Sequence, residues 1–128
     1  MLRLSKDEFS RMFGTKEKKR SKYGNKKCEW MGFEFDSKKE RDRFIILDAA
    51  QRDGEISGLQ RQVKFVLIPD QYIDGKLVER SMSYIADFTY RDKQGNMIVE
   101  DVKGLRTKEY INKRKTLLWL YGIRIHEI

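Results

Sequence analysis

The alternation of hydrophobic and polar positions is clearest in the stretch "SYIADFTYRDKQGNMIVEDVKG", residues 83–104. Two alternating runs flank the polar loop "DKQGN", whose glycine suits the positive φ of a tight turn, so the pattern predicts a β-hairpin. If Arg91 and Met97 close the loop, Asp87 lies directly opposite Asp101 on the partner strand. Aspartate is disfavoured inside strands, so both carboxylates require an explanation.

Two helices are predicted from their start and stop signals. Ser37 and Glu40 form an S-x-x-E capping box, and Gly54 is placed to end the helix that follows. The second helix is predicted at about residues 107–121, where Gly122 stops it.

The remaining hydrophobic runs predict strands and connections. They are a short hairpin at 27–37, a strand at 61–69, a long polar connection at 70–81 and a last strand at 123–128. The order along the chain is helix, three strands, helix, strand. This order favours an α/β fold in which helices pack against a small mixed sheet.

Charge divides the chain into two parts. Residues 1–27 hold ten Lys and Arg against three acids, a net of +7, whereas residues 28–128 hold 18 against 17, a net of +1. We therefore expect a flexible basic arm over residues 1–27 and one folded domain over residues 28–128. Such an arm is typical of nucleic-acid binding, because neutralising phosphates releases counterions, and Lys22, Lys26 and Lys27 are candidates for it. A solvated tail that only aids solubility is the alternative.

Cysteine content and hydrophobicity exclude several classes of protein. A single cysteine, Cys28, cannot form a disulfide framework or a cysteine zinc site. No apolar run approaches the ~18 residues that a membrane helix needs, and the N-terminus lacks the apolar segment of a signal peptide. We expect a cytoplasmic protein that does not bind membranes.

The opposed carboxylates of the hairpin predict a metal site. Side chains directly opposite each other in an antiparallel pair lie ~4.5–5.5 Å apart at Cβ, where two negative charges repel unless a cation lies between them. Mg²⁺ is a hard cation that is typically held by one or two carboxylates together with substrate phosphate. Lys103 follows Asp101 by two residues on the same strand face, where it would either stabilise charge that develops on a phosphate or help to orient an attacking water.

These residues also carry a resemblance to a known family. An Asp in one strand and D-x-K in its hairpin partner resemble the active-site signature of the PD-(D/E)XK nuclease superfamily. Together, "FDSKKERDRF", "YIADFTYRD" and "VEDVKG" resemble a family of small phage and prophage proteins that includes nucleases of the Holliday-junction-resolvase kind. The resemblance covers residues 33–128 and implies a restriction-endonuclease-like core, a mixed β-sheet flanked by helices.

The resemblance also implies roles for individual residues. Asp87 matches the metal-binding aspartate, Asp101 the second acid and Lys103 the catalytic lysine. Glu40 matches a glutamate that many members supply from the first core helix. Asp87, Asp101, Glu40 and the carbonyl of Val102 would then hold Mg²⁺ or Mn²⁺.

One departure, one rejected decoy and two open alternatives accompany the match. Ala86 stands before Asp87, where the name-giving motif has proline. The literal "PD" at 69–70 has no opposing acid and is rejected as the site. Glu40 is either a metal ligand or only the helix cap, and Arg114 either extends along the apolar helix face or holds a phosphate.

The function predicted from the sequence is a metal-dependent DNA endonuclease. The resemblance implies hydrolysis of phosphodiester bonds in branched DNA such as Holliday junctions, by a homodimer, during DNA recombination in a bacterial or phage-infected cell. The alternatives are a non-catalytic nucleic-acid-binding module and a nuclease of the same fold that acts on RNA.

Overall fold

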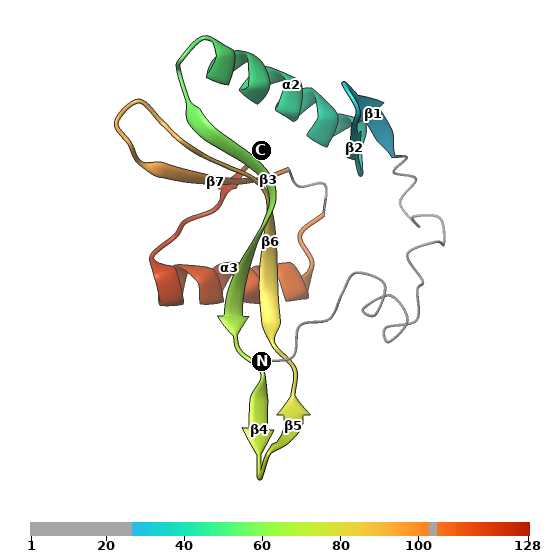
Figure 1. Ribbon diagram of the computed structural model, residues 1–128, viewed down its shortest axis with the longest axis vertical. Coiled ribbons are helices and arrows are strands. Elements are labelled where there is room, and N and C mark those ends of the chain that lie inside the picture. The colour runs from blue at the N-terminus through green and yellow to red at the C-terminus, as the bar shows by residue number, and fades with distance from the viewer. Residues whose placement is uncertain (1–26, 103–104) are drawn as a thin grey trace.

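A four-stranded mixed sheet forms the centre of the fold (Figure 1). The computed structural model describes residues 27–102 and 105–128. In spatial order the strands are β3 (Ser57–Ile68), β6 (Met82–Arg91), β7 (Met97–Asp101) and β8 (His126–Glu127). Strand β6 is antiparallel to both β3 and β7, whereas β8 runs parallel to β7. The predicted α/β class with a mixed sheet and flanking helices is confirmed.

Both predicted helices are present, and Ser37 and Gly122 cap them as predicted. Helix α2 (Lys38–Arg52) begins after Ser37, whose Oγ accepts a hydrogen bond of 3.1 Å from the backbone N–H of Glu40. Helix α3 (Lys108–Tyr121) begins after Thr107 and ends at Gly122, which has a φ of 66°. Within the described residues, no helix is long and apolar enough to cross a membrane.

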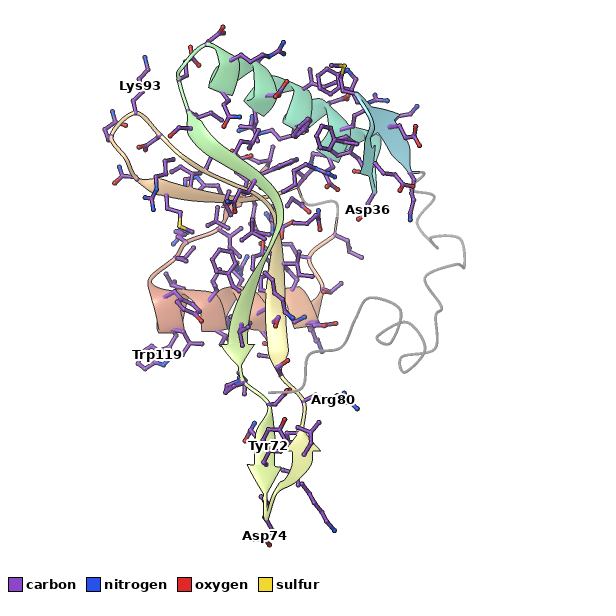
Figure 2. The ribbon with its side chains drawn as sticks, viewed as in Figure 1. Asp36, Tyr72, Asp74, Arg80, Lys93 and Trp119 are labelled. Carbon is purple, nitrogen blue, oxygen red and sulfur yellow. The ribbon has the colours of Figure 1, made fainter. Side chains whose placement is uncertain are left out.

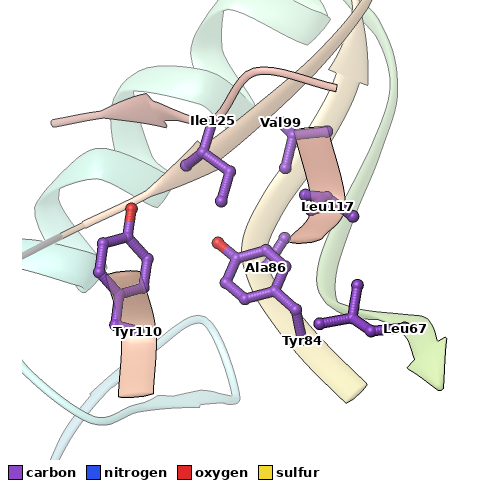
Figure 3. Close-up of a cluster of buried hydrophobic side chains, with 7 residues drawn as sticks. All are labelled: Leu67, Tyr84, Ala86, Val99, Tyr110, Leu117 and Ile125. Atoms are coloured by element: carbon purple, nitrogen blue, oxygen red, sulfur yellow. The ribbon is translucent and has the colours of Figure 1, made fainter. Parts of the chain in front are cut away.

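Each helix packs against the sheet through its own hydrophobic cluster, and the two helices lie on opposite sides of it (Figure 1). The α2 cluster is built around Phe35, Phe44, Leu47 and Phe88. The α3 cluster, drawn in Figure 3, contains Leu67, Tyr84, Ala86, Val99, Tyr110, Leu117 and Ile125. The two clusters meet the sheet at different points along β3 and β6.

Strand β6 changes the face it presents between these two clusters. Ala86 belongs to the α3 cluster and Phe88 to the α2 cluster, although residues two apart share a face in a regular strand. Opposite Asp87, on β3, lies Gln62, whose φ of 53° is left-handed. The switch therefore places Asp87 between the two clusters, at the junction of the two helices with the sheet.

The predicted N-terminal hairpin forms and packs against α2. Strands β1 (Cys28–Trp30) and β2 (Phe33–Phe35) are antiparallel. The rings of Trp30, Phe33 and Phe35 lie with centroids 5.2–6.0 Å from that of Phe44. This hairpin thus fixes the N-terminal half of α2 over the sheet.

The connection predicted at 70–81 is wrong, because this segment forms a hairpin of its own. Strands β4 (Gln71–Ile73) and β5 (Lys76–Glu79) extend beyond the main sheet (Figure 1). Asp74 and Gly75 both have positive φ at its tip, where the dipeptide Asp-Gly is a strong signal for a hairpin turn (Figure 2).

Two predicted strand limits also need correction. The strand predicted at 61–69 begins earlier, at Ser57, and the last strand covers only His126–Glu127 rather than 123–128. Strand β8 is short because it pairs only with the last two residues of β7. Ile123 and Ile125 instead pack into the α3 cluster.

Candidate active site

The hairpin that carries the predicted site has the predicted register. Arg91 pairs with Met97 and the ladder continues to Phe88 and Glu100. One step further, Asp87 and Asp101 lie on neighbouring strands. There the backbone N–H of Val102 donates to Asp87 Oδ2 at 2.8 Å, so the carboxylate replaces a ladder carbonyl as the acceptor.

A cavity of about 410 Å³ lies beside these strands. It is lined by residues of β6 and β7 and by the N-terminal turns of α2 and α3. Five acidic residues line it: the three predicted acids Glu40, Asp87 and Asp101, together with Asp36 and Glu109. The structure therefore brings together three of the four residues predicted to be catalytic, and Val102 lines the same cavity.

Asp101 is buried and held in place, with 3% of its surface exposed. The hydroxyl of Tyr84 donates a hydrogen bond to its Oδ2. Burial raises the pKa of Tyr84, and the bond to Asp101 raises it further, so the phenol remains a donor. Tyr84 belongs to the α3 cluster, and its hydroxyl adds a polar anchor to the site.

Asp87 has an unusually high pKa for an aspartate. Burial raises the pKa of Asp87 to about 7, the charge of Asp101 and then that of Glu40 add to the shift, and the Val102 N–H opposes it. Two carboxyl groups in contact resist simultaneous ionisation. A cation placed between them would relieve this repulsion.

Glu40 combines the two roles that the sequence left open. Its backbone N–H is capped by Ser37, while its side chain is 5% exposed and lines the cavity. Its Oε1 accepts a hydrogen bond of 3.1 Å from the amide of Gln62. Burial raises the pKa of Glu40, and the charge of Asp36 adds to this effect.

The donor set is suited to a hard divalent cation that brings further ligands. Among the described residues, no group of three or more His, Cys, Asp or Glu is arranged to hold a metal ion by itself. Asp87 and Asp101 interact directly, whereas Glu40 meets Asp87 through Gln62. Two carboxylates suffice for Mg²⁺, which usually keeps several waters and binds substrate phosphate.

The predicted basic residues have different positions. Lys103, Lys22 and Lys26 lie outside the described residues, and Lys27 is exposed at the start of them. Arg114 Nη1 donates to Glu127 at 3.1 Å, so the structure does not bring it to the cavity. The basic residue that lines the cavity, within the part of the chain described, is its neighbour Lys113.

Two further acidic residues, one beside the predicted motif and one in the rejected "PD", have structural roles. Glu100 is not among the residues that line the cavity, and its carboxylate is bound by both Nε and Nη2 of Arg43, at 2.8 and 2.6 Å. Asp70, of the rejected "PD", accepts a hydrogen bond of 2.6 Å from the Ser81 N–H at the base of the β4–β5 hairpin.

The chain belongs to a family described as "Protein of unknown function (DUF1064)", whose sequence model matches residues 20–125. No curated protein and no solved structure gives a significant match to the chain.

Proposed function

We propose that this protein is a metal-dependent endonuclease that hydrolyses phosphodiester bonds in DNA. The observation that supports the proposal is the convergence of Asp87, Asp101 and Glu40 on one cavity. Burial and the charge of Asp101 keep the pKa of Asp87 near 7, which is the electrostatic situation that a bound cation stabilises. The resemblance to PD-(D/E)XK nucleases gives the same assignment.

The residues of the chain have distinct roles in this proposal. Asp87, Asp101 and the Val102 carbonyl would hold Mg²⁺ or Mn²⁺, with Glu40 beside them. The ion would supply positive charge at the scissile phosphate and lower the pKa of a bound water. Tyr84 and the Val102 N–H orient the two aspartates. Lys103 is assigned from the sequence to stabilise charge on the phosphate.

DNA is the proposed substrate because the charge of the chain suits a polyanion. The formal charge is +8, of which residues 1–27 carry +7. A basic segment that is separate in the sequence from the carboxylate residues can neutralise phosphates and release their counterions. Binding through phosphates positions the substrate with little dependence on its base sequence.

Branched DNA is the finer proposal, and it involves a homodimer. One chain carries one set of Asp87, Asp101 and Lys103, so it cuts one strand at a time. Resolution of a four-way junction needs two symmetric nicks, which a two-fold dimer can supply. The resemblance to junction-resolving phage proteins points to the same substrate.

The test is cleavage of labelled four-way junctions and of linear duplexes of the same arm sequence, in EDTA, Mg²⁺ and Mn²⁺. We expect cleavage only with metal, and Asp87→Asn and Lys103→Ala should each lower its rate on the order of a hundredfold or more. Asp42→Asn and Lys93→Ala are matched controls; Lys93 lies at the tip of the β6–β7 hairpin (Figure 2).

The outcomes separate the levels of the proposal. DNA binding without metal-dependent cleavage would replace the nuclease with a binding module, and cleavage of RNA alone would replace the substrate. Equal rates on junction and duplex would remove the preference for branched DNA. A strictly monomeric active species, measured by light scattering, would remove the paired-nick mechanism and leave the nuclease.

A further inference from the structure

Gln62 has a backbone conformation that glutamine rarely adopts. Its φ is 53°, in the interior of strand β3, where the neighbouring residues pair regularly with β6. The left-handed region disfavours residues with a Cβ and is entered mainly by Gly, Asn and Asp. Glutamine at this position therefore lowers stability unless its side chain provides a compensating interaction.

The side chain of Gln62 contacts two of the cavity carboxylates. Its Nε2 donates to Glu40 Oε1 at 3.1 Å and lies 3.4 Å from Asp87 Oδ1. A primary amide has two N–H donors, so one group can serve both acceptors. Gln62 thus links the carboxylate of helix α2 to that of strand β6 without adding a charge.

The contact from Gln62 completes the fixation of Asp87. One carboxylate oxygen accepts from Gln62 and the other from the Val102 N–H at 2.8 Å. Because the amide is neutral, it leaves the negative charge of both acids available to a cation. Gln62 is itself exposed, so its side chain meets the two acids from outside the buried cluster.

We propose that Gln62 is a positioning residue of the carboxylate site. Its side-chain amide holds Glu40 and Asp87 in the orientation in which they bind a divalent cation. This inference depends on the proposed function. The proposed role accounts for the left-handed backbone of Gln62. A φ near 53° directs its side chain toward the two acids, at the point where strand β6 changes the face it presents. Partners that orient metal ligands typically contribute 10–100-fold in metal affinity.

The experiment compares Gln62→Gly with Gln60→Gly, a matched change two residues earlier on the same strand. Glycine adopts positive φ without strain, so Gln62→Gly should fold, whereas Gln60→Gly should lower Tm because glycine weakens a regular strand. Titration calorimetry with Mn²⁺ should show about tenfold to a hundredfold weaker binding for Gln62→Gly. Gln60→Gly should bind Mn²⁺ like the wild type.

Gln62→Glu supplies a second, independent variant of nearly the same shape. A carboxylate there would add a third negative charge beside Glu40 and Asp87, so Tm in EDTA should fall. Mn²⁺ should then raise the Tm of this variant by more than it raises that of the wild type. A purely structural role for Gln62 predicts the same Mn²⁺-induced shift in all variants.

The outcomes distinguish this inference from the proposed function. Wild-type Mn²⁺ affinity in Gln62→Gly, or an equal loss in Gln60→Gly, would overturn the role of Gln62 while leaving the metal site in place. A wild-type protein that binds no Mn²⁺ would overturn the proposed function, and this inference with it.

Discussion

At the scale of one residue, the buried carboxylate of Asp87 lowers the free energy of unfolding when it ionises. Burial raises the pKa of this carboxyl to about 7, and the nearby charge of Asp101 adds to the effect. In the unfolded chain the pKa of Asp87 returns to the ordinary aspartate value of 3.8. Between these values the folded protein binds more protons than the unfolded chain, so its stability falls as the pH rises.

We therefore predict that Asp87→Asn stabilises the metal-free protein at pH 8 and changes its stability little at pH 4. Above pH 7 both acids of the pair must ionise in the wild type, and asparagine removes this repulsion while its carbonyl still accepts from Val102. The gain is at most about 4 kcal/mol, because one pKa unit corresponds to about 1.4 kcal/mol and Asp101 shares the shift. Urea unfolding in EDTA measures it.

The control for this prediction is Asp42→Asn, an exposed aspartate on α2. Its effect on the free energy of unfolding should be small at both pH values. A gain for Asp87→Asn of the same size at pH 4 and pH 8 would show that the repulsion is not the cause.

The sequence was sufficient for the residues whose positions follow from strand or helix periodicity. Asp87 and Asp101 follow from the hairpin register, and Glu40 from its place on the buried stripe of α2. Gln62 could not be predicted, since glutamine in a strand gives no signal for a φ of 53°. Lys113 was not singled out, because its side chain leaves helix α3 about 100° away from that of Arg114 and the sequence does not show which of these directions faces the cavity.

At the scale of elements, helix α2 is attached to strand β7 by a buried ion pair. Arg43 binds both oxygens of Glu100, which is 1% exposed, and the hydroxyl of Tyr90 donates to the same carboxylate. Glu100 directly precedes Asp101, so this contact also ties the helix that carries Glu40 to the strand that carries the second acid. The pair thus connects two parts of the site from the opposite face of the sheet.

We predict that Arg43→Ala destabilises the protein by roughly 3–5 kcal/mol, because it leaves the buried Glu100 without its cation. Arg41→Ala is the matched control two residues earlier, where the arginine pairs with the exposed Asp42 and should contribute only about 0–1 kcal/mol. Urea unfolding at pH 7 gives both values. Equal small losses would show that Tyr90 alone satisfies Glu100.

Element limits were predictable where they depend on local chemistry. Helix α2 begins after Ser37 and its C-cap Asp53 directly precedes Gly54, and helix α3 lies between Thr107 and Gly122. Strand β8 could not be delimited in this way, because its length depends on where β7 ends. The β4–β5 hairpin was missed although Asp74-Gly75 signals its turn, since the segment is polar overall and lies outside the core.

At the scale of the whole molecule, charge and the candidate site occupy different parts of the chain. The segment 28–128, which contains the cavity, has a net charge of +1, whereas residues 1–27 have +7. If the basic segment provides the electrostatic part of DNA binding, its removal should change affinity and salt dependence together and leave the carboxylate site intact.

We predict that deletion of residues 1–22, which contain eight Lys and Arg, weakens binding to a linear duplex and flattens its dependence on salt. The slope of log K against log[salt] should shrink by about 0.9 for each phosphate that the segment had neutralised. Fluorescence anisotropy in EDTA measures the slope without cleavage.

A full-length variant with Lys16, Lys18, Lys19 and Arg20 changed to glutamine separates the effect of charge from that of chain length, because it should show part of the same flattening. Mn²⁺ affinity should stay unchanged in both variants, since the aspartates lie outside the altered segment. A slope equal to that of the wild type would assign the segment to solubility alone.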